Sequence, residues 1–304
     1  MNFDQWVVCL DLTKMDPILI RYIDYFAEKL QPECITFLHV IETSSISNEL
    51  LNQFPEYNKI NDLKEYISND LTEKITSQFN SPSFEIQTVI KEGNPTDRII
   101  EFVNSQKFDL LIMGKKTGYK GEGTIARKII KYVISSVLFV PETSRYTLRQ
   151  ALVPIDFSEQ SARAVKKASE IVSRNDGRVT AQHIYTYPAR FFPAIPTEEV
   201  MEKMDHHLNE KKKNFIREYG LGKDVEFVFS LHQEGEKMDE IYDQVSRDQT
   251  DIIFVANKSD KKLKSIFRDD FIDKMIHYLF GIPVFILKDK TKHKKFIESL
   301  FRST

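Results

Sequence analysis

One short pattern occurs twice in this chain and constrains its fold more than any other feature. An apolar strand that ends in an aspartate and leads into a helix is found at residues 7–13 and again at residues 153–158. The two aspartates, Asp11 and Asp156, are 156 − 11 = 145 residues apart, about the length of one domain. A repeat of this period predicts two domains of the same fold, which we place at residues 1–145 and 146–304.

The composition agrees with two globular domains and narrows the classes of partner. The chain has 304 residues, of which 41% are hydrophobic and 29% charged, and its formal net charge is −2. Such a balance gives no global attraction to nucleic acid or to an anionic membrane. No apolar run approaches the ~20 residues that span a bilayer, and the N-terminus has no pattern of a signal peptide. We therefore expect a cytoplasmic protein with neither nucleic acid nor membrane as a partner.

Strand-like and helix-like segments alternate through both halves. In the first half we predict a first helix with Asp16 as N-cap and Pro17 at the first helical position. Three further helices are expected around 63–75, from about 99, and from 124 to about 134. The second half repeats the order, with helices near 162–172, 198–219, 238–245 and 271–279. The strands are expected at 6–10, 34–41, 84–90, 110–113 and 137–140, and then at 152–155, 179–185, 225–229, 252–256 and 283–287. This alternation predicts an α/β fold of two doubly wound domains, each a five-stranded parallel sheet with helices on both faces.

In sheets of this kind, ligands bind beyond the carboxyl ends of the strands. Asp11 and the loop after Met113 both lie at such ends. Four of the ten glycines, at positions 114, 118, 121 and 123, fall within ten positions of that loop. Glycine lets backbone amides approach a phosphate closely, and Thr124 would begin the next helix, whose free amides favour an anion. A flexible surface loop with a Gly-Thr helix start is the alternative.

The corresponding span of the second half, residues 256–270, contains no glycine and ends in Asp269 and Asp270. Residues with Cβ atoms do not readily form the same cradle of amides, and two carboxylates would repel a phosphate. Asp156 therefore has no phosphate loop beside it, and we expect this second site to be vestigial for nucleotide.

Other features of the sequence have plain structural explanations. His206 and His207 lie in a charged helix without further metal-ligand spacing, and residues 211–213 form too short a lysine run for nucleic acid. Cys9 and Cys34 lie in apolar strands and are expected to be reduced and buried. The aromatic, proline-rich residues 185–196 either pack over their own domain or form a docking loop for a partner. We find no catalytic constellation of any familiar type.

Several of these segments together resemble a known family. The opening Leu-Val-Pro-Ile-Asp-Phe-Ser-Glu-Gln-Ser at 152–161, the glycine loop with Gly-Thr-Ile-Ala-Arg-Lys at 123–128, and the final strand at 136–141 match its motifs in order. His39-Val40 and His183-Ile184 fall where its second strand ends. Over nearly its full length the chain resembles two fused universal stress protein domains.

The resemblance implies ATP binding in the first half, with Mg²⁺ able to accompany the nucleotide. It places the contacts at Asp11, Thr13, Val40, Met113, Gly114, Lys116, Gly118, Gly123, Thr124 and Ile125. The family loop is Gly-x-x-Gly, nine residues, then Gly-Ser or Gly-Thr, whereas here three residues separate Gly114 from Gly118 and four separate Gly118 from Gly123. This shortening affects phosphate contacts more than adenine and ribose contacts.

The resemblance also implies a regulatory stress-response protein rather than an enzyme. Two alternatives stay open, a scaffold of the same fold without nucleotide and a weak ATPase. Protein partners are expected but not identified by the sequence. Because family members often pair their last strands, the two halves are expected to form an intramolecular pseudo-dimer, with a homodimer as a second form of assembly.

Overall fold

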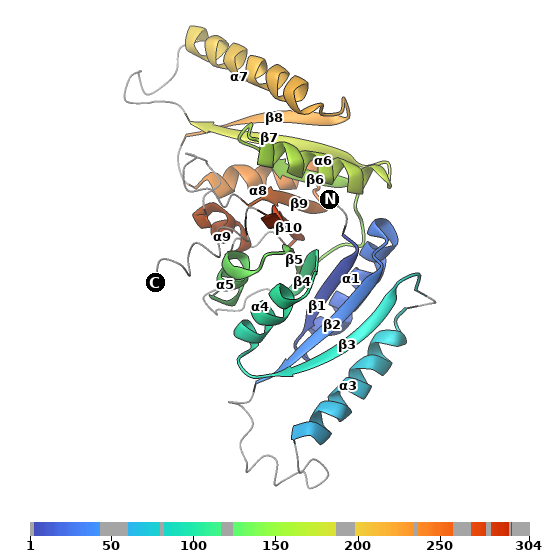
Figure 1. The fold of residues 1–304 in the computed structure, drawn as a ribbon. Helices are drawn as coiled ribbons and strands as arrows, with labels where there is room; N and C mark the ends of the chain where they lie inside the picture. The colour runs from blue at the N-terminus through green and yellow to red at the C-terminus, as the bar shows by residue number, and fades with distance from the viewer. Residues whose placement is uncertain are drawn as a thin grey trace. The chain divides into compact units, whose positions relative to one another are not determined.

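We describe a computed structural model of the chain, in residues 3–42, 60–79, 82–116, 124–186, 198–233, 236–257, 269–277, 281–291 and 293. The chain divides into two compact units (Figure 1), one of Met1–Tyr146 with Lys288–Thr304 and the other of Thr147–Leu287. No helix in these residues combines the length and the hydropathy needed to cross a bilayer.

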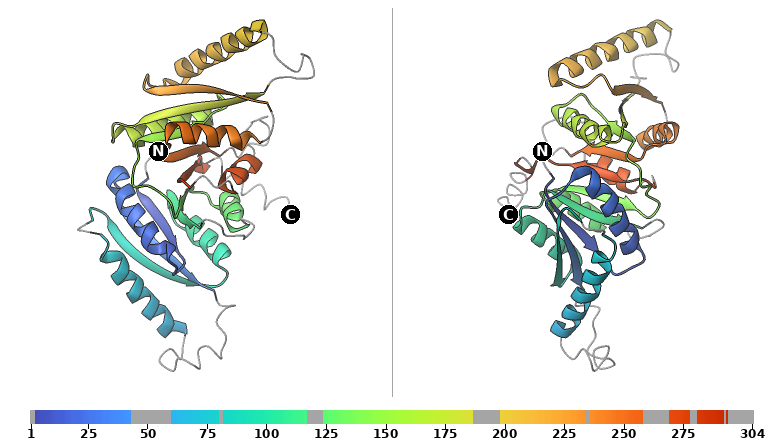
Figure 2. Two further views of the ribbon diagram at one scale, coloured as in Figure 1. Left: turned by 180° about the vertical axis from the view of Figure 1, so that it is seen from behind. Right: turned by 90° about the vertical axis from the view of Figure 1, so that its right-hand side faces the viewer.

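The first unit is a parallel sheet with strand order β3-β2-β1-β4-β5. Its alternating helices cover the sheet, with α1 and α4 on opposite faces in the right-hand view of Figure 2. The fully buried Trp6 packs on Phe26 of α1, at 5.6 Å between ring centroids. The elements are β1 (Gln5–Leu10), α1 (Met15–Leu30), β2 (Cys34–Ile41), α3 (Ile60–Thr76), β3 (Glu85–Glu92), α4 (Pro95–Ser105), β4 (Leu110–Lys115), α5 (Thr124–Tyr132) and β5 (Ser136–Pro141).

The second unit repeats this arrangement with strand order β10-β9-β6-β7-β8, and its pairings are also parallel. Helices α6 and α8 lie on opposite faces of the sheet (Figure 2). The elements are β6 (Gln150–Pro154), α6 (Glu159–Ser173), β7 (Arg178–Thr186), α7 (Glu198–Tyr219), β8 (Val225–His232), α8 (Lys237–Asp248), β9 (Ile252–Ala256), α9 (Asp269–His277) and β10 (Val284–Leu287).

The repeat predicted from the sequence extends to single hydrogen bonds. In the first unit the Asp109 carboxylate accepts from the amides of Asp4 and Gln5, at 3.0 and 2.9 Å. In the second unit Asp251, which also directly precedes its strand, accepts from the amides of Arg149 and Gln150 at 2.8 and 3.0 Å. Each aspartate ties the start of one strand to the start of its neighbour, which sets the register of the central pair. The predicted α/β fold with two repeated units is confirmed.

One local prediction is wrong. Asp16 is not the N-cap of the first helix, because α1 begins at Met15, two residues before the predicted first position Pro17, with Lys14 as N-cap. Lys14 makes no side-chain capping bond. The carboxylate of Asp16 instead points back to the preceding turn, where it accepts two backbone amides. An aspartate before a proline suits both positions, so the sequence pattern could not separate them.

Candidate functional site

The turn between β1 and α1 has an unusual backbone conformation. Leu12 has φ of 59°, in the left-handed region that non-glycine residues rarely adopt. Asp16 fixes this turn, since its carboxylate accepts from the amides of Asp11 (3.1 Å) and Leu12 (2.8 Å). Burial raises the pKa of the Asp16 carboxyl to about 6, against the lowering effect of these two amides. The turn thereby directs Asp11 to the carboxyl edge of the sheet.

Three of the predicted site residues come together at this edge. The Asp11 carboxylate accepts from Lys116 Nζ at 2.7 Å and from the Thr13 hydroxyl at 2.5 Å. Burial alone would raise the pKa of Asp11, but these hydrogen bonds outweigh it and hold the pKa below its usual range. The Asp11 side chain is nevertheless 54% exposed and that of Lys116 36%. An ion pair this exposed contributes only about 0–1 kcal/mol, so a ligand can open it at little cost.

Met113 and Gly114 continue β4 to the same edge. Gly114 lies directly against Met15, since a Cβ built on it would stand 2.5 Å from Met15 Cγ. The absence of a side chain therefore lets the start of α1 approach β4. Lys115 follows, and burial lowers its pKa to about 8. The end of β4 thus brings the backbone of Gly114 and the ammonium group of Lys116 to the edge where Asp11 lies.

Val40 lies on the neighbouring strand, one residue beyond the point where Leu10 and His39 are paired. His39 Nδ1–H donates to the Leu10 carbonyl at 2.9 Å, and burial lowers the pKa of the ring. The neutral imidazole thus holds the end of β1, and half-buried Val40 lies next to the Asp11 turn. The sequence identified His39 only as a motif position. It did not predict the hydrogen bond from the His39 ring to the end of β1.

The remaining predicted contacts are placed only in part. Gly118, Gly121 and Gly123 lie outside the described residues. Thr124 is the first residue of α5, and Ile125 after it is 49% exposed. The expectations for the glycine loop and for the Thr124 hydroxyl therefore stay predictions.

The second unit has an equivalent turn with different chemistry. Phe157, after Asp156, has φ of 61°. The Asp156 carboxylate accepts from the Ser158 hydroxyl at 2.6 Å, and Ser161, which forms a capping box with Ser158, replaces the buried aspartate of the first unit. His183 Nδ1–H donates to the Ile155 carbonyl at 2.9 Å, as its counterpart does in β2.

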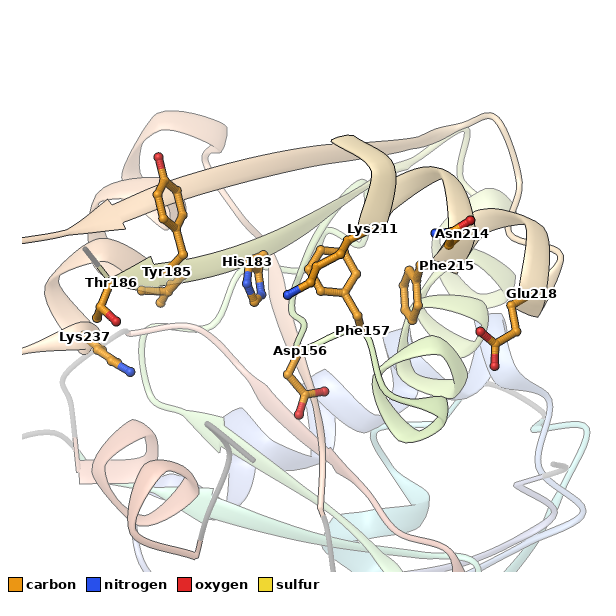
Figure 3. A pocket seen from close by; sticks show the side chains of 11 residues that line it. Asp156, Phe157, His183, Tyr185, Thr186, Lys211, Asn214, Phe215, Glu218 and Lys237 are labelled. Atoms are coloured by element: carbon orange, nitrogen blue, oxygen red, sulfur yellow. The ribbon is translucent and has the colours of Figure 1, made fainter. Parts of the chain in front are cut away.

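At this turn the second unit contains a pocket of about 560 Å³. Figure 3 shows side chains that converge on it from the Asp156 turn, from the end of β7, from α7 and from the start of α8. Sequence reasoning missed this pocket, because it treated the missing glycine loop as loss of the site. The residues that line it are Asp156, Phe157, His183, Ile184, Tyr185, Thr186, Lys211, Asn214, Phe215, Glu218 and Lys237.

Among the described residues, no group of three or more His, Cys, Asp and Glu side chains is arranged to hold a metal ion. The aromatic segment begins at Tyr185 and Thr186, and its residues 187–196 lie outside the described part. Residues 258–268 of the span without glycine also lie outside it.

Comparison with known proteins agrees with this geometry in both halves. The model of the universal stress protein family matches residues 2–141 and again residues 147–288. No curated protein is significantly similar to the chain in sequence.

Solved structures share the fold over nearly the full length. A universal stress protein from Archaeoglobus fulgidus is 17% identical with a TM-score of 0.65, covering 95% of this chain and 99% of its own. A putative universal stress protein from Pseudomonas aeruginosa is 11% identical with a TM-score of 0.63, covering 98% of this chain and 97% of its own. A functionally unknown protein from the same species is 12% identical with a TM-score of 0.62, covering 99% and 98%.

Proposed function

The chain belongs to the universal stress protein family, as a tandem of two family domains, and from this premise we propose that its first half binds one adenine nucleotide. The binding is regulatory rather than catalytic. Occupancy of the site would bias the loop after β4 and, through it, the surface offered to a protein partner.

The observation that carries the proposal is the exposed pair of Asp11 and Lys116. It lies at the carboxyl edge of a doubly wound sheet, where such folds take their ligands. When the pair opens, Asp11 is free to accept from ribose hydroxyls. Lys116 is then free to bind a phosphate as a point charge.

The neighbouring groups fit the same ligand. Val40 and Met113 are half-buried apolar side chains on strands next to β1, suited to the face of a base. Lys115 adds a second amine at the start of the glycine loop. ATP is the ligand proposed, and Mg²⁺ would bind through its phosphates. The absence of a catalytic constellation in the sequence supports regulation, with slow hydrolysis as the weaker alternative.

The first test is chemical. Purified protein is denatured, and the extract is separated by chromatography for ATP, ADP and AMP, followed by calorimetric titration of ligand-free protein with ATP. We expect at most one ATP per chain. A stoichiometry near two would contradict the placement in the first half alone. No detectable binding would favour the scaffold without nucleotide.

A pair of matched substitutions locates the site. Gly123→Asp places a carboxylate in the proposed phosphate loop, where like charges at contact repel by about 1–4 kcal/mol. This corresponds to a roughly five-fold to thousand-fold loss of ATP affinity. The same change in the second half, Ser265→Asp, should leave affinity unchanged. Melting temperatures are measured alongside, because a well-folded Gly123→Asp variant with normal affinity would refute the loop assignment.

Asp11→Asn tests the edge of the sheet independently of the loop. It removes the carboxylate that Lys116 and Thr13 hold, while Asp156→Asn is the control in the second half. We expect a loss of ATP affinity only for Asp11→Asn. Equal affinity in both variants would exclude Asp11 from the site.

A further inference from the structure

We propose that the pocket of the second unit binds a small planar anion, namely an aromatic ring with one carboxylate or phosphate group. This site lies entirely in the second unit and uses none of the residues proposed for ATP. The chain would thus have two ligand sites of different chemistry.

The pocket has an aromatic wall suited to a flat ring. The Phe157 ring lies tilted against the His183 ring, at 4.5 Å between centroids, and edge-on to the Phe215 ring at 5.4 Å. Phe215 is fully buried on α7, whereas Phe157 remains half-buried at the pocket. Aromatic faces attract other flat rings at such distances. A volume of about 560 Å³ leaves room for one or two fused rings.

Two ammonium groups reach this wall. In Figure 3 the side chains of Lys211 and Lys237 point toward the space beside His183. Within the described residues, neither lysine has an ion-pair or hydrogen-bond partner. The pKa of the His183 ring is lowered chiefly by burial and further by these two lysines, whereas the hydrogen bond to Ile155 and the charge of Asp156 raise it.

The neighbouring lysines of α7 behave differently. Lys212 lies over the ring of Phe227 at 5.2 Å, and Lys213 pairs with Glu210 at 2.8 Å. Of the three consecutive lysines, only Lys211 lines the pocket. Lys211 therefore brings to the pocket a positive charge that no ion pair or hydrogen bond within the described part of the chain occupies.

The pocket also has two carboxylates, Asp156 and Glu218, which carry negative charge. Asp156 accepts from the hydroxyl and the amide of Ser158, at 2.6 and 3.3 Å. Glu218 lies on the exposed side of α7. In Figure 3 both carboxylates lie away from the ammonium groups of Lys211 and Lys237, so an anionic group of a ligand beside His183 would meet these two positive charges first.

The experiment titrates the full chain by calorimetry with phenyl phosphate and with benzoate. Benzyl alcohol serves as a ring without charge, and inorganic phosphate as an anion without a ring. We expect saturable binding of one or both aromatic anions at one site per chain, with at least ten-fold weaker binding of the two control compounds. Equal binding of inorganic phosphate, or no saturable binding of either aromatic anion, would overturn the proposal.

Substitutions assign the site to the two lysines. Lys211→Gln and Lys237→Gln should each weaken binding about five-fold, as expected for loss of one partly exposed charge contact. Lys212→Gln is the matched control on the same helix and should change affinity less than two-fold. A similar loss in the control would show non-specific attraction and overturn the assignment.

A last comparison separates this site from the proposed nucleotide site. Asp11→Asn should leave the binding of phenyl phosphate unchanged, whether or not it weakens ATP. Competition by ATP for the same site, lost in Lys211→Gln, would instead assign the pocket to nucleotide and refute the claim of separate chemistry.

Discussion

Asp16 and Ser161 occupy the same position of the repeat, five residues after Asp11 and Asp156, and they support the same backbone turn differently. The Asp16 carboxylate accepts two amides from a buried position. Ser161 instead uses its hydroxyl in a capping box with Ser158. A carboxylate binds amides more strongly than a hydroxyl does, but it carries a charge that burial disfavours. The first unit is therefore sensitive to pH at a position where the second is not.

We predict that Asp16→Asn removes a pH dependence of stability. The folded pKa of about 6 lies above the unfolded value of 3.8, so the folded state binds the proton more tightly. The contribution of Asp16 to the free energy of unfolding is therefore complete below pH 3.8 and is lost as the pH rises through about 6. The difference corresponds to at most about 3 kcal/mol.

Urea unfolding of wild type and variant at pH 4 and pH 7 measures this effect as a difference between the two proteins. Asp205→Asn, on the exposed face of α7, is the control for the substitution itself. If wild type and Asp16→Asn lose stability equally between these pH values, the dependence comes from other groups.

Gly114→Ala should destabilise the first unit by about 1–3 kcal/mol through overpacking. The new Cβ would stand 2.5 Å from Cγ of Met15, which is itself buried. Combining it with Met15→Ala removes the clash, so the double variant should be more stable than the sum of the two single changes predicts. Additive losses in chemical unfolding would show that the close approach is not what requires glycine here.

At the scale of single elements, helix α5 depends on a lysine far along the chain. Lys288, only 1% exposed, donates to the carbonyls of Ile130 and Val133 at 2.6 Å each, at the C-terminal end of this helix. The last carbonyls of a helix have no partner within it. A cation there also interacts favourably with the negative end of the helix dipole. The nine-residue α5 carries Thr124 and Ile125 of the proposed site at its other end.

We predict that Lys288→Met costs about 1–3 kcal/mol of unfolding free energy, because it leaves buried carbonyls without donors. Lys274→Met is the control, since Lys274 is 57% exposed and pairs with Glu236 on the surface. Its loss should cost about 0–1 kcal/mol. Equal costs for both variants, measured by urea unfolding, would contradict the capping role.

Most elements could be predicted from the sequence, since apolar periodicity is strong in long helices and buried strands. Helix α7 covers residues 198–219 and strand β9 covers 252–256, as the pattern predicts. Helix starts were less certain, and Asp16 shows why, because one carboxylate can cap a helix or hold a turn. The second pocket could not be predicted, since the sequence does not show that Lys211 of α7 and Phe157 line the same space.

At the scale of the whole molecule, each unit has a largely apolar strand at one end of its own strand order. These are β5 and β10, whose residues are buried throughout. An uncovered apolar edge strand pairs readily with other chains and causes aggregation. Family members often pair their last strands. We therefore predict that the two halves form an intramolecular pseudo-dimer, with a homodimer as the alternative way to cover these strands.

Small-angle scattering of the purified chain over a range of concentrations tests this prediction. A compact particle of one chain's mass at every concentration is the expected result. A mass that doubles with concentration would favour the homodimer. A profile of two separate, freely jointed domains would refute the pseudo-dimer.

A charge in the middle of one strand, Phe285→Lys, sharpens the test, because it buries an ammonium where the wild type has an apolar ring. We expect it to expand or aggregate the chain, whereas the same change at the exposed Tyr242 should leave the profile unchanged.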